Sequence, residues 1–289
     1  VRSGRSSHPG RVSVETPVIE QQAPPQRQWS WRLLPALLVS TSAIALYGFQ
    51  VRPLGWAMLA AALVIAAIGD RPLFRHLLLI AIGMTIISAT PLKADLSNAG
   101  MVRFFVALTL AVLVPYLIMR FIYKERIIVF PVRTGQRWSR TEWGYMALVL
   151  VLGYFLLPLY FIGSGVYQNW PAVPDGDQIF RLFLGVNFVG LWDELFFVCT
   201  VFALFRHHFV FWQANVLQAI VFTSFLWELG YQFWGPALTG TFALLQGYVF
   251  QRTKSLPYIV TIHLSFDAII FMILVHAHNP ALFPIFVTA

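Results

Sequence analysis

Nine long apolar stretches follow one another along this chain, and they constrain its fold more than any other feature. A helix needs about 20 apolar residues to cross the roughly 30 Å hydrocarbon core of a bilayer. The stretches are continuous rather than alternating, which favours helices over the strands of a barrel. Two of them are short and contain Gly and Pro (53–69 and 235–251), so eight spans are also possible. The predicted spans are 32–50, 53–69, 74–92, 101–122, 142–162, 179–205, 209–231, 235–251 and 256–277.

The composition agrees with an all-α polytopic membrane protein. Hydrophobic residues make up 58% of the 289 residues and charged residues only 11%, whereas roughly a quarter of an average soluble domain is charged. Too few polar side chains remain to cover a soluble fold. The single cysteine, Cys199, excludes an intramolecular disulfide.

The positive charges predict the orientation. With the N-terminus in the cytoplasm and the spans alternating, 16 of the 20 Lys and Arg residues fall on the cytoplasmic side, as the positive-inside rule requires. The net charge of +8 is therefore explained by membrane topology, and we expect no nucleic-acid partner. The four exceptions on the outer side are Arg52, Lys93, Arg103 and Arg181.

Four segments follow from this pattern. Residues 1–28 are rich in Arg, Ser, Pro and Gln and are predicted to be a disordered, basic cytoplasmic tail. Residues 29–162 form an N-terminal module of five spans, and 163–178 an outer loop with two aspartates and no Lys or Arg. Residues 179–289 contain the last four spans, which we expect to form the functional core.

Five ionisable residues lie inside predicted spans, and all belong to this last segment. They are Asp193, Glu194, Glu228, His263 and Asp267. A charge at the bilayer centre is costly, so such residues usually face the bundle interior and mark function. Asp193 and Glu194 are adjacent and point about 100° apart on a helix, so one is predicted to line the site and the other to orient or cap it. His263 and Asp267 are four apart and share one helix face.

Each of these residues, taken alone, could have a structural role instead of a functional one. A membrane acid, for example, can pair with Arg181 or Arg206 and so hold two helices together. The five residues have no Lys or Arg at the same depth, however. An unpaired cluster of acids would stay protonated, bind a cation or hold a catalytic proton. Gly240 and Gly247, seven apart on the eighth span, are predicted to let a neighbouring helix approach closely.

Residues 179–277 resemble the CPBP intramembrane peptidases, the CAAX-processing and bacteriocin-processing (Abi) family. The segment Leu245-Gln-Gly-Tyr-Val-Phe-Gln-Arg-Thr-Lys-Ser-Leu-Pro-Tyr-Ile-Val-Thr-Ile-His-Leu-Ser-Phe-Asp267 resembles the family's Gly-containing helix, its short turn and its His-x-x-x-Asn/Asp motif. His263 and Asp267 take the two motif positions. Asp193-Glu-Leu-Phe-Phe-Val198 resembles the family's Glu-Glu-x-x-x-Arg motif.

The chain departs from the family at three motif positions. Asp193 replaces the first glutamate, which in the family is thought to activate water, and Val198 replaces the arginine. The family's Phe-x-x-x-His motif aligns with Ser224-Phe-Leu-Trp-Glu228, which puts Glu228 at the histidine position. A displacement of about 1 Å can cost two orders of magnitude in rate, so these changes bear directly on catalysis.

Three functions follow from the resemblance and its departures. The sequence favours a non-proteolytic scaffold or subunit of a membrane complex. The second is an active intramembrane endopeptidase, with Asp193 or Glu194 as the base for water and with His263 and Asp267 holding the water or the substrate carbonyl. The third is a metal-dependent membrane enzyme with Zn, Fe or Mn bound by Glu194, Glu228, His263 and Asp267. Both catalytic functions predict that Glu228→Gln and Asp267→Asn abolish activity.

The expected partners are membrane lipids, with other membrane proteins or a peptide substrate as further candidates. The expected location is a bacterial cytoplasmic membrane, in which the chain is integral.

Overall fold

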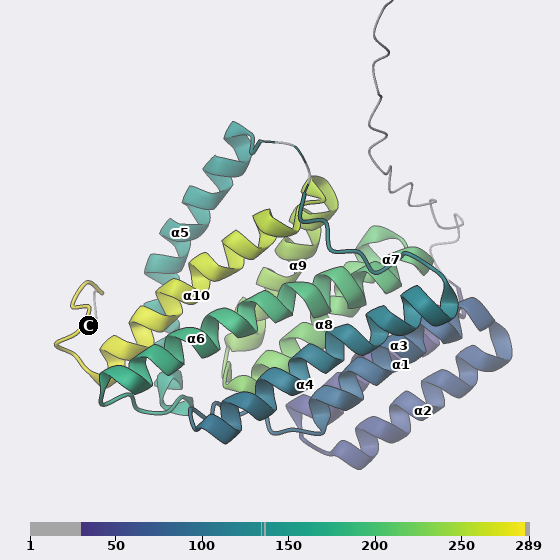
Figure 1. The fold of residues 1–289 in the computed structure, drawn as a ribbon, viewed down its shortest axis with the longest axis horizontal. Helices are drawn as coiled ribbons and strands as arrows, with labels where there is room; N and C mark the ends of the chain where they lie inside the picture. The colour runs from purple at the N-terminus through teal and green to yellow at the C-terminus, as the bar shows by residue number, and fades with distance from the viewer. Residues whose placement is uncertain (1–29, 134, 136, 287–289) are drawn as a thin grey trace, which may run out of the picture.

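The computed structural model describes residues 30–133, 135 and 137–286, and the predicted tail 1–28 lies outside them. The described part is all helical and contains nine helical rods, as predicted. Figure 1 shows their arrangement. Their bounds are α1 Leu33–Ala43 with a π-helical end Ile44–Gly48, α2 Arg52–Gly69, α3 Arg71–Ser88, α4 Asn98–Leu117 with a π-helical end Ile118–Tyr123, α5 Arg140–Phe161, α6 Gly176–Asp193 running through a π-helical segment Glu194–Phe202 into α7 Ala203–His208, α8 Phe211–Leu229, α9 Gly235–Thr253 and α10 Leu256–His278.

The helix starts follow from local sequence. Asp70, Ser97, Ser139, Asp175 and Ser255 are N-caps whose side chains accept backbone N–H groups of the first turn, at α3, α4, α5, α6 and α10 respectively. At α5 the cap is a complete capping box, because the N3 glutamate also accepts the N-cap backbone N–H at 2.6 Å. These caps satisfy orphan donors where the chain enters each helix.

Six of the rods are long and apolar enough to cross a membrane by length and composition, so the chain is a polytopic membrane protein. The other three are α1 with its π-helical end, α8 and α9. Polar side chains lower the hydropathy of α8 and α9, and they are buried: Gln213, Asn215 and Gln218 on α8, and Thr239 and Gln246 on α9. A helix surrounded by other helices can carry such groups, provided that they find partners.

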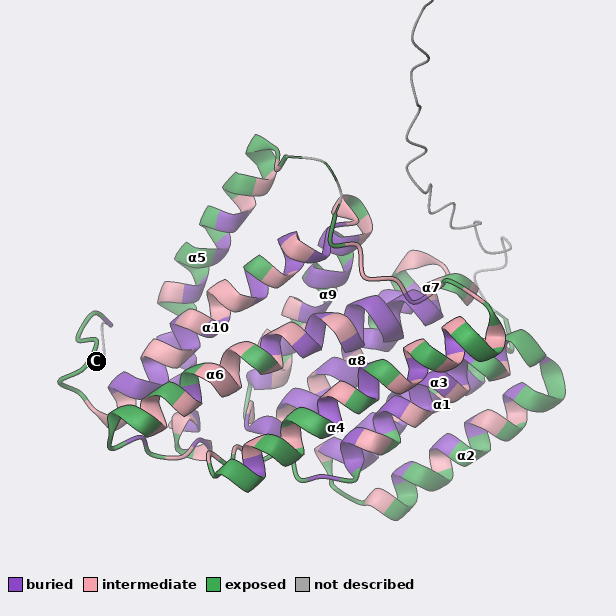
Figure 2. Cartoon of the chain, viewed as in Figure 1, coloured by how far each residue is buried: buried purple, intermediate pink, exposed green. Residues whose placement is uncertain are grey.

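Helix α8 lies inside the bundle, packed against α1, α9 and the π-helical segment 194–202. Figure 2 shows it largely buried, whereas α2 and α5 are largely exposed on their outer sides. Both predicted glycine contacts are present, because a Cβ on Gly247 would meet Asn215 and one on Gly240 would lie 3.3 Å from Thr223 Oγ1. The amide of Asn215 donates to the Leu244 carbonyl oxygen at 2.8 Å. Small residues and amide donors thus hold α8 and α9 together.

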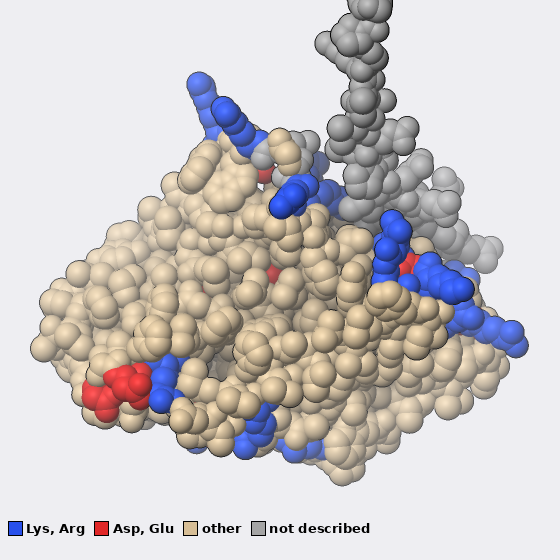
Figure 3. All heavy atoms as spheres, viewed as in Figure 1, with Lys and Arg blue, Asp and Glu red and all other residues tan. Residues whose placement is uncertain are grey.

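The charges lie at the two ends of the bundle. In Figure 3, Lys and Arg gather along the upper and right-hand edges and again at the lower edge, and the broad band between them is almost free of charge. At the end predicted to be cytoplasmic, His76 joins three elements: its ring nitrogens lie 2.7 Å from Glu125 Oε2 and 2.6 Å from His208 Nε2. His208 is therefore part of a half-buried contact between α3 and α7.

Candidate active site

Four of the five predicted site residues meet where α6 and α10 cross. Asp193, Glu194, His263 and Asp267 are each at most 6% exposed. His263 Nδ1 lies 2.7 Å from Glu194 Oε1, and His263 Nε2 lies 3.8 Å from Asp193 Oδ2. The two acids thus approach opposite nitrogens of one imidazole ring.

The local helix geometry explains this arrangement. The chain changes from α-helical to π-helical at Glu194, and Thr200 Oγ1 donates to the carbonyl oxygen of Leu195, five residues earlier, at 2.9 Å. Insertions of π-helix are frequent at functional sites. The side chains of Asp193 and Glu194 point in different directions. The His263 ring lies between their carboxyl groups, with Nε2 toward Asp193 and Nδ1 toward Glu194.

Asp267 reaches the site because α6 carries a glycine opposite it. A Cβ on Gly190 would overlap Asp267 Oδ2 and would lie 3.2 Å from His263 Cδ2. The two helices therefore approach each other closely at Gly190. The predicted stacking of His263 and Asp267 on one face of α10 agrees with this contact, since both side chains lie against the same glycine.

Gln246 on α9 is a site residue that the sequence reasoning missed. Its Nε2 donates to Glu194 Oε1 at 2.6 Å and lies 3.1 Å from the Ile259 carbonyl oxygen. Gln246 Nε2 and His263 Nδ1 thus both lie within hydrogen-bond distance of the same Glu194 oxygen. A buried amide inside a predicted span is a signal that could have identified Gln246.

Several oxygen atoms of this cluster lack a hydrogen-bond donor among the described residues. They are Asp193 Oδ2, Glu194 Oε2, Gln246 Oε1 and Asp267 Oδ2, all fully buried. The described ion pairs of Asp193 and Glu194 are with His263, while Arg181 pairs with Asp177. Among the described residues, no Lys or Arg forms an ion pair with Asp193, Glu194 or Asp267.

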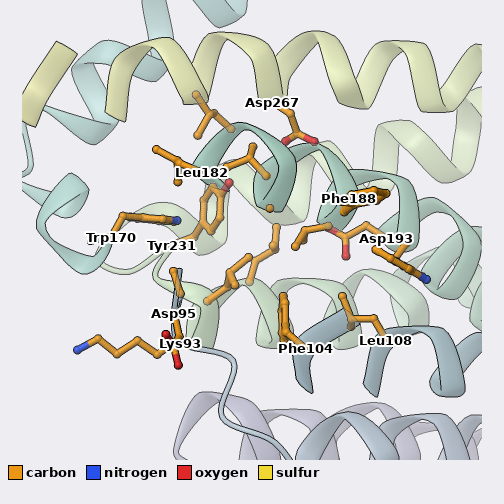
Figure 4. A pocket seen from close by; sticks show the side chains of 18 of the residues that line it. Lys93, Asp95, Phe104, Leu108, Trp170, Leu182, Phe188, Asp193, Tyr231 and Asp267 are labelled. Carbon is orange, nitrogen blue, oxygen red and sulfur yellow. The ribbon is translucent and has the colours of Figure 1, made fainter. Parts of the chain in front are cut away.

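A cavity of about 360 Å³ leads to this cluster. Asp193, His263 and Asp267 line it, whereas Glu194 lies behind His263 and does not. Figure 4 shows Asp193 and Asp267 at one end, Lys93 and Asp95 at the other, and Phe104 and Leu108 along one wall. Helix α4 supplies that wall, so the predicted N-terminal module contributes to the site.

Glu228 lies outside the cluster. It does not line the cavity, and its Oε1 accepts from the Leu92 backbone N–H at 3.4 Å. Leu226 and Leu229 of the same helix line the cavity instead. Residues two apart on a helix point about 200° apart, so Glu228 cannot share the face of Leu226.

The residues proposed as metal ligands do not form a metal site. Within the described ranges, no group of three or more His, Cys, Asp or Glu side chains is arranged to hold a metal ion. Glu228 points elsewhere, and Glu194 Oε1 is already bonded to Gln246 and lies against His263.

The comparisons with known proteins agree with the resemblance in the C-terminal part. Residues 175–269 match the family model described as type II CAAX prenyl endopeptidase Rce1-like. The match runs from the N-cap of α6 into α10 and includes the whole Asp193–Glu194–His263–Asp267 cluster. The comparisons with curated proteins and with solved structures found no match.

Proposed function

We propose that this protein is an intramembrane hydrolase of the CAAX-endopeptidase type, which cleaves a peptide bond brought to Asp193 and His263 through the apolar cavity. One observation carries the proposal. Asp193, His263 and Asp267 line the inner end of the cavity with Glu194 behind them, and an oxygen atom of each of the three carboxyl groups has no donor among the described residues.

These unsatisfied oxygens favour catalysis over a purely structural role. A buried polar atom without a partner costs roughly 1–3 kcal/mol, and more if the group is charged. A scaffold gains nothing from burying such carboxyl groups beside a cavity, since apolar side chains would pack there at no such cost. A hydrolase needs free acceptor atoms where water and the scissile bond meet.

The contacts suggest a division of roles. Asp193 lines the cavity and takes a proton from water as the water oxygen attacks the scissile carbonyl carbon. The C–N bond then breaks, and the proton passes to the leaving nitrogen, which gives a new carboxyl group and a new amine. His263 and Asp267 hold the water or the substrate carbonyl. Glu194 and Gln246 keep the His263 ring in place from behind.

A non-proteolytic scaffold is the second candidate, and a specific observation favours it. Val198 is buried where the family motif has its arginine, and Glu228, at the aligned histidine position, does not reach the cavity. A chain that has lost catalysis could keep the fold with these changes. Such a scaffold would keep the buried cluster of acids and histidine but would cleave no peptide.

The test uses the full chain in proteoliposomes with a quenched fluorescent peptide that ends in a farnesylated CAAX sequence. Asp193→Asn and Asp267→Asn should each lower the cleavage rate by about two orders of magnitude or more, the usual contribution of a general base. Glu228→Gln is the matched control and should leave the rate within about two-fold. The sequence alone predicted that Glu228→Gln abolishes activity. We now expect little effect, because Glu228 does not line the cavity.

Cleavage in ¹⁸O-labelled water should place the label in the new carboxyl group. Equal thermal unfolding midpoints would show that the variants fold. If the wild type cleaves no peptide while it co-purifies with a stoichiometric membrane partner, the hydrolase proposal is rejected in favour of the scaffold.

A further inference from the structure

The opposite end of the cavity carries cations that the membrane topology does not explain. Two of the four cations predicted on the outer side, Lys93 and Arg103, line the cavity, and both are exposed. A third, Arg181, donates to the Leu96 carbonyl oxygen and to Asn98 Oδ1 in the same loop. We call Lys93, Asp95 and Arg103 the cavity mouth.

The cavity mouth has a positive group free to bind an anion. Arg103 Nη2 lies 3.5 Å from Asp95 Oδ2, and Asp95 Oδ1 accepts the Ser97 backbone N–H at 2.9 Å. In the part of the chain that the structure describes, Lys93 has no ion pair or hydrogen bond. The cavity mouth therefore has a net charge of +1, with the Lys93 ammonium unpaired.

The walls behind this mouth are almost wholly apolar. Helix α4 contributes Phe104, Phe105 and Leu108, and helix α6 contributes Phe188, Val189 and Trp192. These two helices lie side by side (Figure 1) with few contacts between them, and residues of both line the cavity. A molecule with an apolar chain and one anionic end would match both the walls and the mouth.

We propose that the cavity binds one acyl chain of an anionic phospholipid from the outer leaflet, with the headgroup phosphate on Lys93 and Arg103. The inference concerns the same cavity as the proposed function and names a molecule that would enter it. It rests on the proposed function, in which this cavity leads to the reacting groups. Its test measures binding alone, so that it can fail while hydrolysis is present, or succeed while hydrolysis is absent.

The experiment titrates the purified full chain in dodecyl maltoside with phosphatidylglycerol or phosphatidylcholine and counts bound lipids by native mass spectrometry. The wild type should retain one phosphatidylglycerol in clear preference to phosphatidylcholine. Lys93→Gln combined with Arg103→Gln should weaken that binding about 25-fold, since each cation near a lipid headgroup contributes about a five-fold factor.

Two further variants separate the mouth from the cavity and from overall charge. Arg71→Gln with Arg252→Gln removes the same charge from exposed positions at the other end of the bundle and should leave the preference unchanged. Gly185→Phe places a ring in the cavity, where a Cβ on Gly185 meets nothing within 4 Å, and should abolish binding of either lipid. Unfolding midpoints near that of the wild type establish that each variant is folded.

The proposal is overturned by any of three results. An equal loss in the mouth variant and in the charge-matched control would mean general electrostatic adsorption. Displacement of the lipid by inorganic phosphate at equal concentration would mean a simple anion site. Unchanged binding in Gly185→Phe would mean that the acyl chain lies outside the cavity.

Discussion

Substituting Gly190 by alanine tests the close packing of α6 against α10, because it adds one methyl group at their contact. Its Cβ would overlap Asp267 Oδ2 and crowd His263 Cδ2 at 3.2 Å, so Gly190→Ala must push α10 away or turn the Asp267 side chain. Overpacking of this kind costs about 1–3 kcal/mol. A shift of about 1 Å at the cluster would also lower a hydrolysis rate by about 10²-fold.

Gly185→Ala is the matched control, because Gly185 lies in the same helix and a Cβ there meets nothing within 4 Å. Both changes gain up to about 1 kcal/mol of helix propensity, so the control should be neutral or slightly stabilising. The free energy of unfolding is measured by SDS titration, followed by tryptophan fluorescence. If Gly190→Ala is as stable and as active as Gly185→Ala, the close packing of Asp267 on Gly190 is wrong.

Three further predictions address the surroundings of the cluster. Gln246→Leu removes the 2.6 Å donor to Glu194 and should lower the hydrolysis rate at least ten-fold with little change in KM, because Gln246 does not line the cavity. Hydrogen bonds from Ser97 hold the pKa of Asp95 below its usual range, so Asp95→Asn should strengthen phosphatidylglycerol binding. The difference in binding between wild type and Asp95→Asn should persist at neutral pH, where Asp95 is ionised. It should vanish only as the pH falls through the lowered pKa of Asp95. Gly247→Ala should destabilise the protein by about 1–3 kcal/mol in a thermal unfolding assay, since the new Cβ would overlap Asn215 of α8, which is buried and bonded to the Leu244 carbonyl oxygen.

The number and approximate bounds of the helices could be predicted because each is an apolar run bounded by polar or charged residues. The prediction 179–205 became a helical rod from Gly176 to His208, which is longer at both ends. The added residues are the first turn after the Asp175 cap and the histidines that contact α3. Apolar content indicates where a helix crosses the membrane, whereas caps and end contacts decide where it stops.

Contacts between distant elements could not be predicted in the same way. Periodicity placed His263 and Asp267 on one face, because both lie in regular helix. The π-helical segment that begins at Glu194 has no comparable signal, so the opposed approach of the two acids to His263 was not predicted. Gln246 is separated from Glu194 by 52 residues and meets it only through the packing of α9.

The register of α8 explains why Glu228, the residue selected by the motif alignment, lies away from the cavity. The alignment Ser224–Glu228 puts an acid at the family's histidine position, but that acid faces Leu92 and not the cavity. A shift of two residues gives Phe222-Thr-Ser-Phe-Leu226, which keeps the motif's phenylalanine and places Leu226 on the cavity wall. In this register, Leu226 stands where the family motif has its histidine. The proposed site then contains a single histidine, His263, and hydrolysis would depend more strongly on the carboxyl groups.

The cluster and the cavity mouth come from different parts of the chain. The residues proposed for hydrolysis all lie within 175–269, the part that matches the CAAX endopeptidase model. The mouth and one wall come from 91–108, outside that match. In the proposed function, the reaction chemistry depends on the first part and the charge of the cavity mouth on the second, while both parts supply the apolar walls of the cavity. A chain can therefore keep the chemistry of one family while the segment from the end of α3 through α4 selects a different molecule.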